Sequence, residues 1–382
     1  MKVLQRLRVS NILLFISFFY LLLFFIHAFV LHKTVYGDGI FYFSHLRSVV
    51  FDRDLQYLNE YTYFGASQPV TPVGGPGNKY SIGPALLWLP NYVFLRSIAF
   101  GSGYEFPYQL SVGLTSVFYA LIGLLLLSRI LMKIVPESAA SLTIFCIASV
   151  TTLLFYGSID PVNSHAVSFF TVALFLSLLF TPPRRWFAIG ATLGSILLVR
   201  PQDAIAAILI LAFLPRRAVI PIAKVAVGAL LMFLPQLLVW KYLYGVWLAS
   251  PYILEGEKFF FFAPHVVDVL FSPKNGLFTY SPIVFFAIFG FFLSWKNLNF
   301  LKKYVLAICV LQIYIISTWS SWNQGASFGI RMFTGTLPLL SFPLAFLMKK
   351  LINRIGVWPI FLSSISLSLL TLILSLSVLL RN

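Results

Sequence analysis

Charged side chains are scarce in this chain. They make up 10% of its 382 residues, whereas soluble domains contain about 25%. Acidic residues are the rarest, with 11 against 27 lysines and arginines. Hydrophobic residues make up 59%, and windows of roughly 20 apolar residues recur along the whole chain. This composition excludes a soluble globular protein and predicts an all-α polytopic membrane protein.

Cysteine is the next shortage. The two cysteines, Cys146 and Cys309, both lie inside apolar segments, which excludes a cysteine-based metal cluster and argues against a structural disulfide. The sequence also contains no tandem repeat, low-complexity tract, Walker loop, zinc motif or Ser-His-Asp arrangement. Functions that depend on those motifs are therefore not predicted.

The apolar windows predict about eleven membrane spans in a single domain, 1–382, with no separate soluble domain. The first span, 11–31, is too long and too aromatic for a secretory signal peptide and lacks a small-residue cleavage site, so we expect it to be retained. The other predicted spans are 107–133, 138–157, 162–181, 186–200, 202–215, 219–241, 281–295, 303–320, 333–350 and 356–380.

Two segments of the first outer loop, 32–106, are expected to form interfacial helices on the outer side of the membrane. They are 40–55 and 82–100, and a second outer loop covers 242–280. Segment 82–100 is interrupted by two prolines and an arginine, and as a span it would invert every later loop. Segment 40–55 is expected to be amphipathic, with an apolar face of Tyr42, Leu46, Val49 and Val50 and polar positions that include Ser44, His45, Arg47 and Ser48.

The basic residues indicate which side faces the cytoplasm. Lys2, Arg6 and Arg8 precede the first span, and most other lysines and arginines fall in the predicted inner loops, where Glu137 is the single acid. By the positive-inside rule, the N-terminus is cytoplasmic, the C-terminus is outside, and the longer, more acidic loops are extracytoplasmic. The net charge of +16 therefore indicates a multi-pass protein of the cell (inner or plasma) membrane and no nucleic-acid partner.

Asp38 is the first candidate for chemistry. It lies between Gly37 and Gly39, directly after the first span. The glycines leave room for a substrate or another backbone segment, and a carboxylate at the membrane surface can act as a general base. The alternative is that Asp38 caps the N-terminus of helix 40–55.

Lys79 is the first candidate for anion binding. It follows a turn rich in glycine and proline, 72–77, which can present a cation and backbone N–H groups to an anion. The alternative is a solvated loop lysine. Tyr80 beside it and His45 on helix 40–55 are further candidates for a substrate cavity.

A second candidate region begins at Asp160. Asp160 followed by proline has the pattern of an N-cap with proline at the first helical position, so we expect it to start a helix. His165 lies one turn further and is a candidate for the substrate cavity. The alternative for His165 is a structural hydrogen-bonding role.

Two arginines are further candidates for anion binding. Arg200 lies at a break between apolar runs and either pairs with Asp203 or faces a water-filled cavity that holds an anion. In the second case Asp203 also belongs to the cavity. Arg331 follows a run of small residues that would let a phosphate approach its guanidinium, and the alternative is an interfacial arginine whose head reaches water.

Six segments, in this order, resemble bacterial members of the GT-C glycosyltransferase superfamily, which includes protein O-mannosyltransferases and lipid A aminoarabinose transferases. The resemblance covers about residues 1–350, and the segments are YGDGIFYFSHLRSVVFDRDLQYLNEY, NKYSIGPALLWLP, NSHAVSFF, LVRPQD, LFSPKNGLFTYSP and NQGASFGIR.

The resemblance implies an extracytoplasmic enzyme that takes a sugar from a polyprenyl-phosphate donor and transfers it, with inversion, to a lipid, glycan or protein acceptor. Asp38 stands where such enzymes have their base, and Lys79 where the aminoarabinose transferases have a lysine on the donor phosphate. Arg331 and Arg200 match by motif as additional phosphate ligands. Gly39 stands where the family often has a second acid, so we expect no metal and no other cofactor.

Two other functions remain open from the sequence. A transporter or flippase of lipid-linked sugars would have paired repeats and broken helices, but the chain shows no repeat and one apparent break, at Pro201. A polymerase or ligase of lipid-linked glycans would also use outer-loop arginines, with a different donor.

Overall fold

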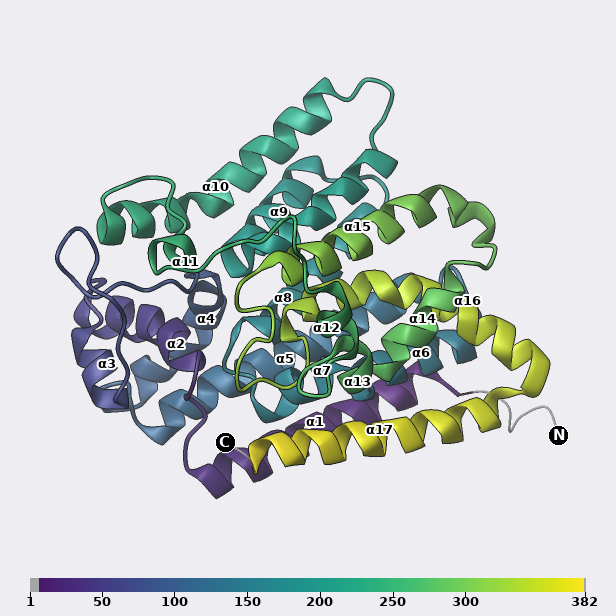
Figure 1. Ribbon diagram of the computed structural model, residues 1–382, viewed down its shortest axis with the longest axis horizontal. Coiled ribbons are helices and arrows are strands. Elements are labelled where there is room, and N and C mark those ends of the chain that lie inside the picture. Colours follow the sequence, from purple (N-terminus) through teal and green to yellow (C-terminus); the bar gives the residue numbers. More distant parts are fainter. Residues whose placement is uncertain (1–6, 381–382) are drawn as a thin grey trace.

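Every regular element within residues 7–380, the part of the chain that the computed structural model describes, is a helix (Figure 1). Extended pairing in this part is limited to two isolated β-bridges. The all-α prediction is therefore confirmed. Lys2 and Arg6, which helped to assign the cytoplasmic side, lie outside the described residues.

Six helical stretches within the described residues are long and apolar enough to cross a membrane. They are α1 (Val9–Leu31), α5 (Phe106–Leu131), α10 (Val219–Tyr244), α15 (Asn299–Thr318), η6 (Arg331–Thr336) continued by α16 (Leu337–Ile355), and α17 (Val357–Leu379). A seventh span is broken. It consists of α6 (Glu137–Ser149), α7 (Thr152–Leu154) and η3 (Phe155–Ile159), with a bend of 66°. Pro201 is thus not the only break in an apolar run.

The predicted count of eleven spans is not confirmed. The remaining predicted spans form shorter helices, which are α8 (Ser164–Leu179), α9 (Trp186–Val199), η4 (Pro201–Ala212) and α14 (Pro282–Gly290). The 14 residues of α9 extend about 21 Å at 1.5 Å per residue, less than the roughly 30 Å of a hydrocarbon core. Length and composition thus support a multi-pass membrane protein with six spans, or seven with the bent pair.

The first loop predicted to lie outside the membrane and the start of the second gather at one end of the molecule, at the left of Figure 1. The first loop forms α2 (Gly39–Arg47), continued by η2 (Ser48–Asp52), then α3 (Leu58–Phe64) and α4 (Gly83–Ile98). The second contributes α11 (Pro251–Leu254) to the same end. The remaining short helices are α12 (Val266–Phe271), α13 (Leu277–Tyr280) and η5 (Lys296–Leu298).

The amphipathic interpretation of segment 40–55 is wrong. All four residues assigned to polar positions are buried, and apolar Val49 is 39% exposed. The polar side chains have partners inside the loop: Ser48, for example, donates to a carboxylate oxygen of Asp54 at 2.6 Å. The segment is therefore a packed helix of a folded loop, because internal hydrogen bonds replace those to water.

Glycines allow α9, which ends directly before Arg200, to pack closely against α10. Side chains at Gly190 and Gly194 of α9 would overlap the backbone of α10, and one at Gly228 of α10 would overlap that of α9. This is the small-residue packing that membrane helices use. A side chain at Gly83 would likewise overlap the backbone of Leu198, so the end of the first loop lies against the end of α9.

Candidate active site

A cavity of about 420 Å³ lies where the two loops, the end of α9 and the start of η6 meet. The sequence candidates Asp38, Lys79, Tyr80, Arg200 and Arg331 all line it. Aromatic residues of α10, of the second loop and directly after α15 also line it, and they are Trp240, Tyr252, Phe259 and Trp319. The cavity therefore combines ionic groups with apolar surface, as a site for an amphiphilic ligand requires.

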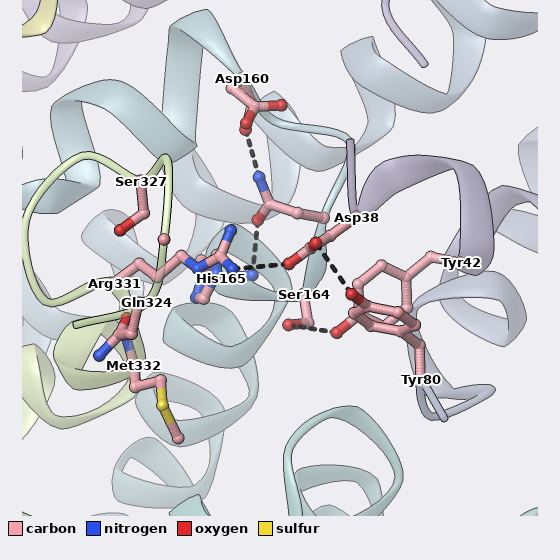
Figure 2. Close-up of polar contacts among 12 residues, drawn as sticks. Asp38, Tyr42, Tyr80, Asp160, Ser164, His165, Gln324, Ser327, Arg331 and Met332 are labelled. Carbon is pink, nitrogen blue, oxygen red and sulfur yellow. Dashed lines mark hydrogen bonds and ion pairs between the residues drawn. The ribbon is translucent and has the colours of Figure 1, made fainter. Parts of the chain in front are cut away.

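Asp38 faces this cavity and does not cap a helix. It stands at the N-terminal boundary of α2, but its side chain makes no capping hydrogen bond. One carboxylate oxygen lies 2.8 Å from Nη2 of Arg331, and the other accepts a hydrogen bond from the Tyr80 hydroxyl at 2.9 Å (Figure 2). The two partners fix the direction of the carboxylate toward the cavity.

Gly39 allows the polypeptide segment before α8 to approach Asp38. A side chain at Gly39 would overlap the carbonyl oxygen of Val162. Gly37 has a φ of +53°, in the left-handed region that favours glycine. The room expected from the two glycines is thus used in part by the chain itself.

The predicted helix start at Asp160 is wrong. α8 begins at Ser164, and its N-cap is Asn163, whose side-chain oxygen accepts from the His165 N–H at 2.8 Å. The Asn163 amide also donates to the Asp160 carbonyl (Figure 2). Asparagine and aspartate cap equally well, so the local pattern alone did not choose between them.

Asp160 does not cap α8 and does not line the cavity, but its carboxyl is linked electrostatically to residues that do. Burial raises the pKa of its carboxyl to about 7, Arg331 opposes this increase, and the charge of Asp38 adds to it. The carboxyl thus belongs to the same electrostatic cluster as Asp38 and Arg331. Its proline neighbour, interpreted as a helix signal, concealed it.

Arg200 shows features of both interpretations. Its Nη1 donates to the Ser164 hydroxyl at 2.8 Å, and its Nε lies 3.8 Å from the Asp203 carboxylate. It also lines the cavity. The pairing with Asp203 is long, so the guanidinium is held in place without being closed off from a ligand.

The structure does not place His165, Asp203 or His45 among the residues that line the cavity. His165 is buried, with Nδ1 3.2 Å from Nη1 of Arg200. Asp203 is buried and accepts from the Ser168 hydroxyl at 2.5 Å and from the Gln312 amide at 3.1 Å. Both residues therefore lie behind Arg200.

His45 contacts the backbone of Tyr80. Its ring nitrogens lie 2.7 Å from the Tyr57 hydroxyl and 2.9 Å from the Tyr80 carbonyl oxygen. Burial lowers the pKa of the imidazole to about 4, so it is neutral at pH 7. Its place fits a structural role in holding the backbone of Tyr80.

Lys79 has partners that the sequence analysis did not expect. Its Nζ lies 3.2 Å from a carboxylate oxygen of Glu255 and 3.2 Å from one of Glu257. Burial lowers the pKa of the ammonium, but the two carboxylates outweigh this and raise it above its usual value. Lys79 therefore stays charged, with its charge engaged by the second loop.

Metal ligands do not cluster at the site. Within residues 7–380, no group of three or more His, Cys, Asp and Glu side chains could hold a metal ion. The expectation of a reaction without a metal or other cofactor stays a prediction.

Comparison with models of known protein families finds no match, and neither does comparison with curated protein sequences. Solved structures do match in fold. The archaeal oligosaccharyltransferase AglB from Archaeoglobus fulgidus, in complex with an inhibitory peptide and a dolichol-phosphate, has a TM-score of 0.56 at 12% identity, over 97% of this chain and 56% of that one.

Two further structures of the Archaeoglobus fulgidus oligosaccharyltransferase agree. The complex with zinc and sulfate has a TM-score of 0.51 at 12% identity, over 95% of this chain and 52% of that one. The apo form has a TM-score of 0.53 at 11% identity, over 97% and 56%. The chain spans about half the length of these structures, and its fold is similar to that of the matched part of the archaeal oligosaccharyltransferase.

Proposed function

We propose that this protein is a membrane glycosyltransferase that moves a sugar from a polyprenyl-phosphate donor to an acceptor on the extracytoplasmic face. The observation that carries the proposal is the Asp38–Arg331 pair at 2.8 Å on the wall of a cavity that Arg200 and Lys79 also line, in a GT-C fold. A base beside cations and apolar surface matches a donor with a phosphate and a lipid chain.

Asp38 is the general base of the proposed reaction. Its carboxylate takes the proton from an acceptor hydroxyl or amine as that group attacks the anomeric carbon. The new bond to carbon forms as the bond to the phosphate oxygen breaks, on the opposite side, so the configuration inverts. Tyr80 donates to Asp38 and keeps it aimed at the acceptor.

The cations take the charge that leaves with the polyprenyl phosphate. Arg331 offers a planar fork suited to phosphate oxygens, and the structure gives its guanidinium one carboxylate partner, Asp38. Arg200 lines the same cavity from the end of α9. Positive groups placed in advance around a leaving phosphate typically lower the barrier by several kcal/mol, at about 3–4 kcal/mol each.

A flippase for lipid-linked sugars is the second candidate, because the span of α6, α7 and η3 is broken by 66°. Broken helices are typical of transporters. Transbilayer movement of a fluorescent polyprenyl-phosphate sugar in proteoliposomes, with no glycosidic bond formed, would favour it over the transferase.

The direct test is sugar transfer in membranes that contain the protein, from a panel of labelled polyprenyl-phosphate sugars. We expect Asp38→Asn to lower the rate about 10²–10⁴-fold, the range for loss of a general base, while the protein still inserts and folds. Asp268→Asn is the matched control, since this exposed carboxylate of the second loop does not line the cavity. Full activity of Asp38→Asn rules out the assigned base.

A further inference from the structure

The contacts of Lys79 connect the two outer loops. Both of its carboxylate partners, Glu255 and Glu257, come from the segment just after α11, and its ammonium also lies 5.5 Å from the centre of the Tyr252 ring. The side chains are 9% exposed for Glu255, 16% for Glu257 and 21% for Lys79. The cluster is shielded from water, so its ion pairs are stronger than pairs on an open surface.

The segment that carries these two carboxylates has a glycine at its start and another near its end. Gly245 has a φ of +76° and Gly256 a φ of +91°, and no atom lies within 4 Å of the place where a side chain would stand at Gly256. After Gly256 the chain is fixed again, because Ser320 donates its N–H to the carbonyl of Lys258 at 2.8 Å. Segment 245–257 thus runs between fixed ends and lines the cavity with residues that include Ser250, Pro251 and Tyr252.

The charge around Lys79 opposes a phosphate in this arrangement. One ammonium faces two carboxylates, so the cluster as a whole is negative. Glu257 is also poorly satisfied, since its second oxygen is buried and has no hydrogen-bond partner within the described residues. A buried acceptor without a partner is unfavourable. We therefore expect Lys79 to be held less strongly by Glu257 than by Glu255.

We propose that Glu255 and Glu257 are positioning residues that hold segment 245–257 against Lys79, and that Lys79 exchanges them for the donor phosphate when the donor binds. The exchange of the carboxylates for the donor phosphate rests on the proposed function, and the tether does not. The exchange moves a wall of the cavity at the moment the donor enters, which links donor binding to the shape of the remaining space. Lys79 then serves first as a tether and afterwards as a phosphate ligand.

Hydrogen exchange of backbone amides in segment 245–257 tests the tether on the full chain in detergent, without substrate. We expect exchange to be at least about fivefold faster in Lys79→Met and in the double variant Glu255→Gln, Glu257→Gln, because each variant removes both ion pairs and even a surface pair contributes up to about 1 kcal/mol. Lys258→Met is the matched control, because it removes the same charge from a position directly after the tested segment, and its side chain is exposed and does not line the cavity. Unchanged exchange in both test variants overturns the tether.

Addition of a short-chain polyprenyl monophosphate to the wild-type chain tests the exchange. We expect faster amide exchange in segment 245–257 of the wild type and no further change in Lys79→Met. An equal response in Lys79→Met overturns the exchange. Failure of the probe to bind any form overturns the exchange together with the proposed function, and the ligand-free comparison then still decides on the tether.

Kinetics separate this role from a merely structural one. In the carboxamide double variant Lys79 is free for the phosphate, so we expect the donor KM to fall several-fold while kcat falls because the cavity wall is loose. In Lys79→Met we expect the donor KM to rise instead. A parallel loss of kcat with unchanged donor KM in both variants overturns the assignment.

Discussion

The structure surrounds Arg47, in the first outer loop, and Arg331, at the cavity, differently. Arg47 donates to the carbonyl oxygen of Ser102 at 3.1 Å and to Glu60 at 3.0 Å, pairs with Asp52, and lies 4.2 Å from the centre of the Tyr104 ring. Arg331 has one carboxylate partner, Asp38, and borders the cavity. The first guanidinium is enclosed by the protein, and the second is partly left for something else.

The difference separates a guanidinium that the protein encloses from one that is accessible from the cavity. Side chains of Arg47 and Glu60 are 9% and 0% exposed, so each must be satisfied from within the fold. Arg331 is 23% exposed and has fewer partners although a guanidinium carries five donors. A half-buried arginine that borders a cavity and has few partners is therefore better evidence for a ligand than an arginine that the protein encloses completely.

The contrast between Arg47 and Arg331 would be contradicted if replacement of Arg47 hardly changed the free energy of unfolding. We expect Arg47→Met to lower the free energy of unfolding by about 3–5 kcal/mol, because Glu60 would be left in the interior without its cation. Sugar transfer per folded molecule should stay near the wild-type value. Thermal unfolding in detergent measures the first effect, and the activity of the folded fraction the second. Arg53→Met, at an exposed neighbour in the same loop, is the control.

Arg331→Met should give the converse result. Loss of an electrostatic contact to the leaving phosphate is expected to lower the transfer rate about 10²–10³-fold, while thermal unfolding changes little. Arg331→Lys keeps the charge without the fork and should recover only part of the rate. A destabilised but fully active Arg331→Met would place this arginine in the same structural class as Arg47.

The close approach of Gly39 to Val162 allows a test of the position of Asp38 at the cavity without a change of charge. In Gly39→Ala the new methyl group overlaps the Val162 carbonyl, so Asp38 must shift. A displacement of about 1 Å at a catalytic group can cost up to 10²-fold, and we expect a loss in the range of 10- to 10²-fold. Gly75→Ala is the control, since nothing lies within 4 Å of a side chain there. Equal rates in both variants contradict the positional argument.

The sequence was informative where one property recurs over many residues. Apolar windows located the six long helical stretches, from α1 to α17, that could cross a membrane, and the position of an aspartate between two glycines directed attention to Asp38, which lines the cavity. Helix length was harder, because an apolar run such as 186–200 has the composition of a span while α9 has only 14 residues. Composition reports what a segment tolerates, and packing decides how far the helix continues.

Contacts between distant segments could not be predicted. Lys79 meets Glu255 and Glu257 across the two loops, and nothing local to either loop indicates the other. The same holds for His45 and Arg47 of segment 40–55, whose partners include Tyr57, Glu60 and Tyr80 further along the chain. Asp160 shows a third limit, since its local sequence predicts a helix start, whereas the structure buries its carboxyl and couples it electrostatically to Arg331 and Asp38.

The smallest expected effect concerns the ionisation of the Arg47 cluster. Burial raises the pKa of the Glu60 carboxyl to about 7, and the hydrogen bond from Arg47 opposes that increase. In the unfolded chain a glutamate titrates near pH 4.3, so between these values the folded state holds the proton that the unfolded state has lost. The stability contributed by Glu60 is therefore largest at low pH and falls as the pH rises from about 4 to 7.

Glu60→Gln carries no such titration and should remove this pH dependence. Relative to the variant, the wild type should lose about 2–3 °C in its unfolding midpoint between pH 5 and pH 8. Parallel pH curves for the two proteins would mean that Glu60 is already ionised well below neutral pH. An ionised Glu60 would then neutralise the charge of Arg47 at neutral pH. Arg47 would differ from Arg331 in the number of negative partners as well as in its burial.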